Sequence, residues 1–262
     1  MHIDFSKVQE KALKGIRRSY VFMGLGINSA EDDRLINYQL TPITNLQLLK
    51  NDLGDDVVSG FKENYSEWVI NNSFRDALES FHIFVEELYL CLIIIKKKAT
   101  DLGKVKQSVK SFEKLPFPKK MEELKRCFSV SPEFIEHIKS INKARNCLSH
   151  RGWVVSKKDF NNVPKTALVV GWRGMNMVLT DQDGERECHM SELVGLVTQH
   201  ETQVGLKFVS REKTFSSCEV LCFEPKELAE ILWYWTMEIN KMVQCSIEYA
   251  KQSGIIIVEP KS

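Results

Sequence analysis

The sequence predicts a mainly α-helical protein in which a small β-rich segment interrupts a bundle of helices. Two long segments, 66–97 and 225–252, carry large apolar residues at alternating spacings of four and three, which is typical of the buried seam of a packed helix. Residues 163–224, just before the last helix, contain short runs with strand character. A chain of 262 residues is long enough to bury a full core around such elements.

The first quarter of the chain contains one clear amphipathic helix, over residues 4–22, because apolar side chains recur there on one side. The following "MGLGINSAEDD" is interpreted as a turn. Its Gly24-x-Gly26 lacks the third glycine and the preceding strand of a nucleotide-binding loop. Short helical pieces are expected over 43–65, and 96–115 is interpreted as a lysine-rich connection.

Two further helices are predicted before the β-rich segment. The prolines of "LPFPKK" mark the start of a helix over 118–128. Ser131 is the expected N-cap of the next helix, with Pro132 at its first position. This helix is expected to run to about His150 and to end at Gly152. Within the β-rich segment, "DQDG" is typical of a hairpin turn.

One position in the predicted helix that ends near His150 departs from its apolar seam. The seam passes through Ile138 and Ile141 and then reaches Arg145 before Leu148. A guanidinium stays charged in proteins, so its burial without partners is costly. We therefore expect Arg145 to meet an acid, a cluster of carbonyl groups, a cavity with water, or a phosphate.

The residues around Arg145 indicate phosphate chemistry. Asn146 follows it directly, and His150 lies one turn beyond Asn146 on the same face. Arginine binds phosphate in a bidentate manner and stabilises developing charge, while histidine transfers protons near neutral pH. Arg145 and His150 are five residues apart, about 140° around an ideal helix. A loosened last turn, or a two-fold dimer that brings two copies of the segment face to face, would let both act on one ligand.

The segment "ARNCLSHRGWVV" resembles the R-N-x-x-x-H motif of the HEPN superfamily (higher eukaryotes and prokaryotes nucleotide-binding domains). "FRDALESFHIFVEELYLCL" is similar to the partner helix of HEPN bundles. The resemblance implies a bundle of four or five core helices that forms a homodimer. It also implies a metal-independent endoribonuclease of phage defence or a toxin–antitoxin system, with Arg145, Asn146 and His150 as catalytic residues at the dimer cleft.

The hypothesis also assigns residues around the catalytic motif. Region 96–126 holds eleven basic and four acidic residues, a surface that could guide RNA or could simply be solvated. Four basic residues are assigned to substrate binding: Lys97, Lys119, Lys120 and Arg151. Two acids are assigned to support the arginine from the neighbouring helix: Glu79 and Glu86.

The resemblance suggests four parts of the chain: an N-terminal helical extension (1–65), a HEPN-like core (66–155), a β-rich insertion (156–224) and a helix that completes the bundle (225–253).

Three alternatives stay open. Arg145 could tie helices together through Glu79 or Glu86, with His150 as a polar residue at the end of its helix. Arg75-Asp76 with His82 also satisfies the loose motif, although it falls in the middle of a helix. The chain could also be a non-catalytic dimeric module that binds a nucleotide, RNA or a protein partner.

Metal sites, disulfides and membrane insertion are not expected. The seven cysteines are scattered without a C-x-x-C pair, which is typical of reduced thiols. Cys188-His189, His200, Cys218 and Cys222 lack the paired spacing of a zinc site, so no metal or other cofactor is expected. The longest apolar run, "LYLCLIII", is too short for a bilayer span. We expect a cytoplasmic protein whose partners are a second copy, RNA and an antitoxin or regulatory protein.

Overall fold

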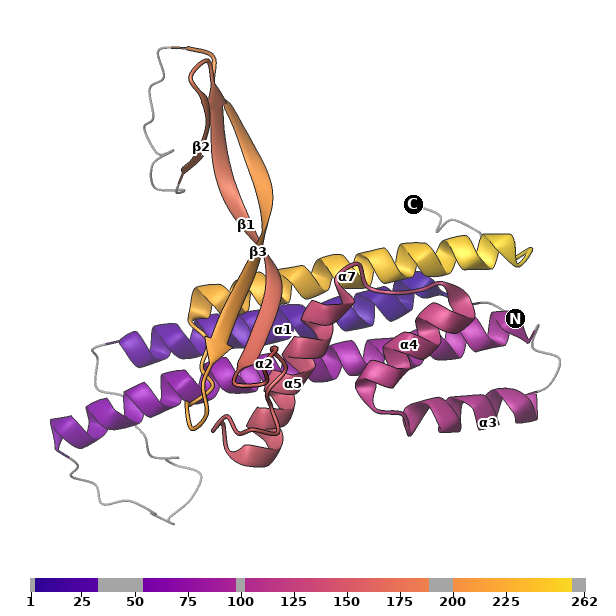
Figure 1. The fold of residues 1–262 in the computed structure, drawn as a ribbon, viewed down its shortest axis with the longest axis horizontal. Helices are drawn as coiled ribbons and strands as arrows, with labels where there is room; N and C mark the ends of the chain where they lie inside the picture. Colours follow the sequence, from indigo (N-terminus) through magenta and orange to yellow (C-terminus); the bar gives the residue numbers. More distant parts are fainter. Residues whose placement is uncertain (1–2, 33–53, 98–101, 189–199, 256–262) are drawn as a thin grey trace, which may run out of the picture.

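The computed structural model describes residues 3–32, 54–97, 102–188 and 200–255. These residues form a mainly helical protein with a small three-stranded antiparallel sheet (Figure 1). The helices are α1 (Phe5–Glu31), α2 (Asp55–Lys96), α3 (Leu102–Glu113), α4 (Phe117–Phe128), α5 (Ile135–Arg151) and α7 (Pro225–Gln252). The strands are β1 (Leu168–Asp181), β2 (Gly184–Cys188) and β3 (Gln203–Phe215), in the order β2-β1-β3. None of the helices described combines the length and apolar content of a membrane span.

Helix α2 is the centre of the bundle. Its predicted seam is confirmed, since each of these residues is at most 4% exposed: Phe74, Leu78, Phe81, Val85, Leu88, Leu92 and Ile95. Helix α1 runs antiparallel to α2, and α7 packs along both, whereas α5 crosses the bundle steeply (Figure 1). The long 4-3 pattern therefore marks the helix that most other elements contact.

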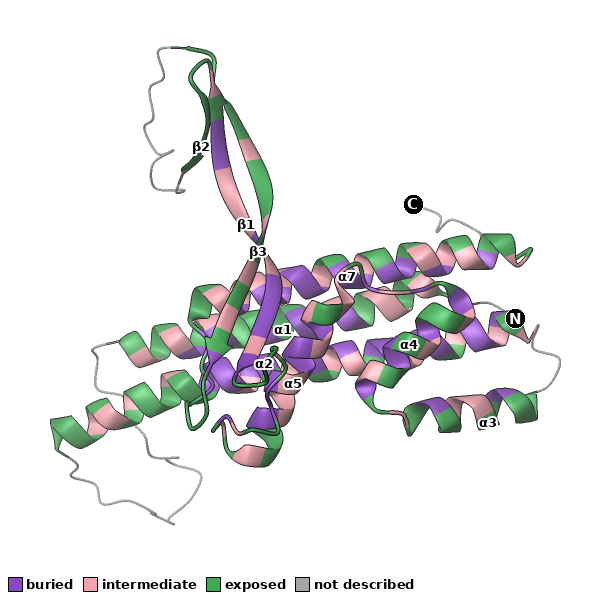
Figure 2. Ribbon diagram, in the orientation of Figure 1, coloured by how far each residue is buried: buried purple, intermediate pink, exposed green. Residues whose placement is uncertain are grey.

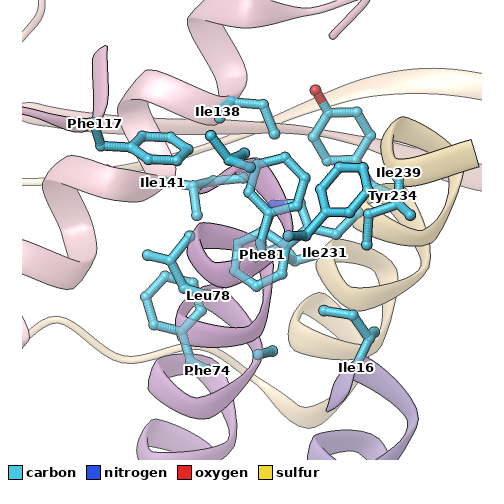
Figure 3. Packing of buried hydrophobic residues seen from close by; sticks show 14 of the residues in the cluster. Ile16, Phe74, Leu78, Phe81, Phe117, Ile138, Ile141, Ile231, Tyr234 and Ile239 are labelled. Atoms are coloured by element: carbon cyan, nitrogen blue, oxygen red, sulfur yellow. The ribbon is translucent and has the colours of Figure 1, made fainter. Parts of the chain in front are cut away.

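The core lies where α2, α5 and α7 meet, and Figure 3 shows its side chains. Trp235 of α7 stacks on Phe74 and Phe81 of α2, with ring centroids 5.9 and 6.1 Å apart. Ile138 and Ile141 of α5 close the cluster and are fully buried. Burial of each such side chain stabilises the fold by roughly 1.5–3 kcal/mol, so this junction fixes the position of α5.

Helix α1 continues to Glu31, and the turn predicted at "MGLGINSAEDD" is wrong. Gly15 and Gly26 lie on the face of α1 that contacts α2. A Cβ added at Gly26 would lie 2.6 Å from both methyl carbons of Val69, and one at Gly15 would lie 2.2 Å from Ser80 Oγ. These glycines are therefore contact residues that let two helices approach closely, and tertiary packing outweighs their low helix propensity.

Alanine substitutions should distinguish a glycine that a close helix contact requires from a glycine with no neighbour at its Cβ position. Gly26→Ala is expected to destabilise the protein by about 1–3 kcal/mol, because the new methyl group forces α1 away from Val69. Gly24→Ala is the matched control, since nothing lies within 4 Å of its added Cβ. That change should stabilise by about 0.5–1 kcal/mol through helix propensity. Urea denaturation measures both, and equal effects would contradict the packing role.

Two further expectations for the first half of the chain are corrected. Residues 55–65 belong to the continuous helix α2, whereas 43–53 lie outside the described residues. The expected lysine-rich connection contains helix α3. Phe112 of α3 stacks on Tyr89 of α2 with ring centroids 3.8 Å apart, and Val105 is the second buried residue of this lysine-rich helix.

The start of α5 is capped from another helix. Ser131 is not the N-cap, because α5 begins at Ile135. The backbone N–H groups of Glu133 and Phe134 donate to the buried carboxyl group of Glu238 on α7, at 2.8 and 3.4 Å. This long-range cap has no local sequence pattern. The predicted stop is confirmed, since α5 ends at Arg151 and the next residue, Gly152, has φ +56°.

Strands β1 and β3 form a twisted ribbon that projects from the bundle, as Figures 1 and 2 show. The predicted "DQDG" turn is confirmed, because β1 ends at Asp181 and β2 begins at Gly184. The near end of the ribbon is anchored in the core by Trp172 and Phe215. The backbone N–H of Gly171 donates to Ser140 Oγ at 3.0 Å, which ties β1 to α5.

Candidate functional site

Arg145 occupies the expected seam position of α5, but its guanidinium is only partly paired. Its side chain is 24% exposed. Nη2 lies 3.7 Å from Glu79 Oε2, and the Glu79 side chain is 60% exposed. Nη1 donates to Asn146 Oδ1 over 3.4 Å, and the buried Nε has no hydrogen-bond partner within the described ranges. The chain therefore holds a half-buried cation in the seam of α5 and leaves part of its hydrogen-bonding capacity unused there.

Arg145 lies between two cavities. The larger, of about 960 Å³, is lined by α2, α4, α5 and the near end of β1. Its wall includes His82, Phe117, Lys120, Asn142, Lys143, Arg145, Asn146 and Gly171. The smaller, of about 510 Å³, is lined by Asn72, Arg75, Asp76, Glu79, Arg145 and Ser149. Of these residues, only Arg145 lines both cavities.

The wall of the larger cavity is basic. It carries four cations, Lys120, Lys139, Lys143 and Arg145, and two acids, Glu136 and Glu212.

Two of these cations pair closely with carboxylates. Lys120 pairs with Glu86, and Lys139 Nζ lies 2.9 Å from Glu136 Oε1. Lys143 instead donates to the carbonyl oxygen of Phe160 at 2.8 Å, and burial lowers its pKa. Arg145 has the Glu79 carboxylate at 3.7 Å, and Lys143 forms no ion pair with a carboxylate in the described structure. The wall thus carries weakly balanced positive charge, which favours an anionic ligand.

His82 of α2 lines the same cavity as Arg145. Its ring stacks on Phe117 with centroids 4.1 Å apart, and its buried Nε2 has no hydrogen-bond partner in the part of the chain that is described. Burial lowers the pKa of His82 from 6.5 to about 4, and the charges of Arg145 and Lys120 add to this shift against a smaller opposing effect of Asn142. The imidazole is therefore uncharged at neutral pH.

Acidification should destabilise the fold through His82. Its pKa is lower in the folded chain than in the unfolded one, so the unfolded state binds more protons between pH 6.5 and about 4. Stability is therefore full above pH 6.5 and falls as the pH falls through that window, by about 2 kcal/mol between pH 7 and pH 5. His82→Phe, which keeps the stack on Phe117, should remove this part of the pH dependence. Denaturant titrations at both pH values compare the two proteins, and identical pH slopes would contradict the assignment.

His150, the predicted catalytic histidine, lies apart from Arg145 in the single chain. It is exposed at the end of α5 and lines neither cavity. The helix is regular through Arg151, so the last turn is not loosened. In such a helix His150 is displaced from Arg145 by about 7.5 Å along the axis and about 140° around it. One copy of the chain thus brings together Arg145 and Asn146, but not His150.

The predicted substrate-binding lysines are used differently. Lys120 lines the larger cavity but pairs with Glu86. Glu86, which was predicted to support Arg145, therefore balances Lys120 instead. Lys97 Nζ donates to Ser108 Oγ at 2.8 Å and so fastens α3 to the end of α2. Lys119 is exposed and pairs with Glu122 at 2.8 Å. Of the lysines assigned to substrate binding, only Lys120 therefore lies at the candidate site.

Arg151, the fourth predicted substrate-binding residue, has a structural partner. Its Nε donates to Asp159 Oδ2 at 2.8 Å, and Nη2 contacts the second carboxylate oxygen. The carboxylate of Asp159 also accepts from the backbone N–H of Ser156 at 2.9 Å. Burial opposes the charged form, but these hydrogen bonds outweigh it and lower the pKa of Asp159. Arg151 thus holds the chain that follows α5.

The sequence showed a polar line along α2 without showing what it faces: Arg75, Glu79, His82 and Glu86. Arg75 and Glu79 line the smaller cavity, and His82 lines the larger one. The weaker motif match thus supplies the histidine that lies on the Arg145 cavity. The sequence-based hypothesis did not include Asn142 and Lys143, which line the larger cavity. The signal for Asn142 was the polar line formed by Lys139, Asn142 and Asn146, at spacings of three and four beside the apolar seam of α5.

The cysteine- and histidine-containing β-rich segment forms no metal centre within the described structure. No group of three or more His, Cys, Asp or Glu side chains that could hold a metal ion occurs in the described ranges, and His189 lies outside them. Comparisons with protein-family models, curated proteins and solved structures find no match to this chain.

Proposed function

We propose that this chain is a HEPN-like RNA-binding protein that holds an RNA phosphate at Arg145 and cleaves the RNA without a metal ion when two copies associate. The observation that carries the proposal is the guanidinium of Arg145 itself. Arg145 occupies a position in the apolar seam of α5 and lines two cavities, and its Nε has no hydrogen-bond partner among the residues that the structure describes. A phosphate oxygen is the ligand that a bidentate, partly buried guanidinium suits best.

The proposed reaction is transesterification within the RNA. The 2′-oxygen attacks the adjacent phosphorus as His150 of one copy removes its proton. The bond to the 5′-oxygen breaks, and the same His150, now protonated, gives that oxygen the proton. Arg145 stabilises the charge that develops on the non-bridging oxygens, and Asn146, which accepts from Arg145 Nη1, orients the guanidinium. The products are a 2′,3′-cyclic phosphate and a 5′-hydroxyl end.

The second copy is needed because of the placement of His150. The imidazole is exposed at the end of α5 and lies on a different side of the helix from Arg145. A two-fold dimer would bring the exposed His150 of one copy to the Arg145 of the other. This dimer is part of the proposal.

The test uses labelled RNA with purified protein in EDTA. Wild type is expected to cleave, while Arg145→Ala and His150→Ala are expected to lose cleavage. Lys241→Ala, an exposed change on α7, is the matched control and should cleave as wild type does. RNA left intact by the wild type, or cut equally by all four proteins, would remove the nuclease.

A second candidate function is a binding module without chemistry. The separation of His150 from Arg145 in one chain favours it, and so does the low pKa of His82, about 4, which makes that imidazole a weak proton acceptor. Here wild type should bind RNA or a nucleotide without cleaving it, and Arg145→Ala should lose binding.

A role in phage defence or as a toxin predicts growth arrest on expression. Relief of that arrest by His150→Ala supports cleavage, whereas arrest that persists in His150→Ala supports the binding module.

A further inference from the structure

Several side chains on the wall of the larger cavity carry a buried polar atom without a hydrogen-bond partner in the described structure. Five buried side-chain nitrogen or oxygen atoms lack a partner in the part of the chain that the structure describes. Three of them, His82 Nε2, His137 Nδ1 and Arg145 Nε, belong to residues that line this one cavity. Buried polar atoms are almost always satisfied in native proteins. Each of these atoms is itself shielded from solvent, so a ligand would reach it only when its side chain turns toward the cavity. Three such side chains on one wall favour a polar ligand.

The two histidines of this wall are matched in their surroundings. His82 stacks on Phe117, and His137 stacks on Phe134 with ring centroids 5.4 Å apart. Burial and a nearby arginine lower the pKa of both imidazoles, through Arg145 for His82 and Arg173 for His137. A neutral imidazole offers one donor and one acceptor, whereas an imidazolium only donates. The wall therefore presents both kinds of group without adding charge.

The cavity also has room for a ligand larger than a phosphate ion. Its volume of about 960 Å³ lies within the range of small-molecule sites, roughly 300–1,000 Å³. A Cβ added at Gly171 of β1 would lie 2.7 Å from His137 Cδ2, so a glycine is what allows strand and ring to lie this close. Asn142 adds an amide to the wall. The cations and the uncharged polar groups thus line one pocket that is open to solvent.

We propose that this cavity binds one whole nucleotide unit, with its phosphate at Arg145 and Lys143 and its base contacted by His82, His137 and Asn142. The inference rests on the proposed function, because it concerns the same Arg145 cavity, and it adds that the site recognises the base. Neutral imidazole and amide groups suit a base edge, which presents donors and acceptors together. A phosphate alone would need neither. The nucleotide is either free or part of an RNA chain.

Calorimetric titration of the full chain in EDTA tests this with the four ribonucleoside 5′-monophosphates and ribose 5-phosphate. Wild type is expected to bind at least one monophosphate about tenfold more tightly than ribose 5-phosphate. His82→Phe keeps the stack on Phe117 but should lose this preference while its affinity for ribose 5-phosphate is unchanged. Lys143→Met should weaken both ligands. Lys241→Met, on the exposed side of α7, should change neither.

A short RNA with and without a 5′-phosphate distinguishes the sources. If the RNA displaces the bound monophosphate, the site takes a nucleotide of an RNA chain. If the RNA does not displace it, the site takes a free nucleotide. Equal affinity of all monophosphates and ribose 5-phosphate in the folded wild type, or no binding of any, overturns the inference. Base-selective binding together with RNA that stays intact removes only the proposed cleavage and leaves this inference standing.

Discussion

Arg145→Leu is expected to abolish RNA cleavage, with a loss of about 100- to 1,000-fold, while the protein stays folded. Leucine completes the apolar seam between Ile141 and Leu148, so it fills the position that the helix pattern assigns to a large apolar residue. The ion pair that it removes is weak, at 3.7 Å from a largely exposed Glu79. The free energy of unfolding should therefore stay the same or rise. A residue kept for function at a cost in stability has this signature.

Arg145→Lys is the matched control for this prediction. Lysine keeps the positive charge but loses the planar pair of donors, so RNA cleavage should fall less than in Arg145→Leu. RNA cleavage and urea denaturation measure the two consequences separately. A clear loss of stability in Arg145→Leu with cleavage retained would show that Arg145 is a structural residue.

Asp159→Ala is expected to have the largest effect on stability, a loss of about 3–5 kcal/mol. The Asp159 carboxylate is 1% exposed, and its removal leaves Arg151 and the Ser156 N–H without their partner. Glu122→Ala is the control, because the Lys119–Glu122 pair is exposed and its loss should cost at most about 1 kcal/mol. Chemical denaturation measures both variants. Similar small losses would show that the Asp159 contacts contribute little.

The same contacts predict opposite effects on stability and nucleotide affinity when the two arginines near the end of α5 are replaced. Arg151→Ala should lower stability, since it leaves the buried Asp159 carboxylate unpaired, yet the intrinsic affinity for a nucleotide should be unchanged because Arg151 does not line the larger cavity. Arg145→Leu should show the opposite pattern. Titration of both variants below their unfolding temperatures compares them. Loss of affinity in Arg151→Ala would restore its predicted role in substrate binding.

The sequence predicted the fold correctly where the signal lies within one helix or one turn. The seams of α2 and α7, the Gly152 stop and the DQDG turn are examples. The errors arose where a partner far away in sequence decides. Gly24 and Gly26 were predicted to form a turn because Val69, which Gly26 contacts, lies on another helix. The cap of α5 comes from Glu238, about a hundred residues later.

The same distinction holds for the candidate site: one residue could be predicted from a local pattern, and the others depend on how distant segments pack. The seam pattern alone marked Arg145 as a cation in a core position. It could not show that α2 places His82 on the same cavity, since this depends on how α2 and α5 cross. Nor could it show that Arg151 pairs with the buried Asp159, because surface and buried cations look alike in a sequence. The Lys119–Glu122 pair, by contrast, has the i, i+3 spacing of a surface pair within the predicted helix.

Subunit complementation tests the central claim most directly, namely that Arg145 of one copy acts with His150 of another. Arg145→Ala and His150→Ala are purified separately, shown to be inactive, and then mixed under conditions that let subunits exchange. Random mixing makes about half of the dimers heterodimers with one intact site of two, so about a quarter of the wild-type cleavage rate should return. A mixture that stays inactive beside an active wild type would contradict the account.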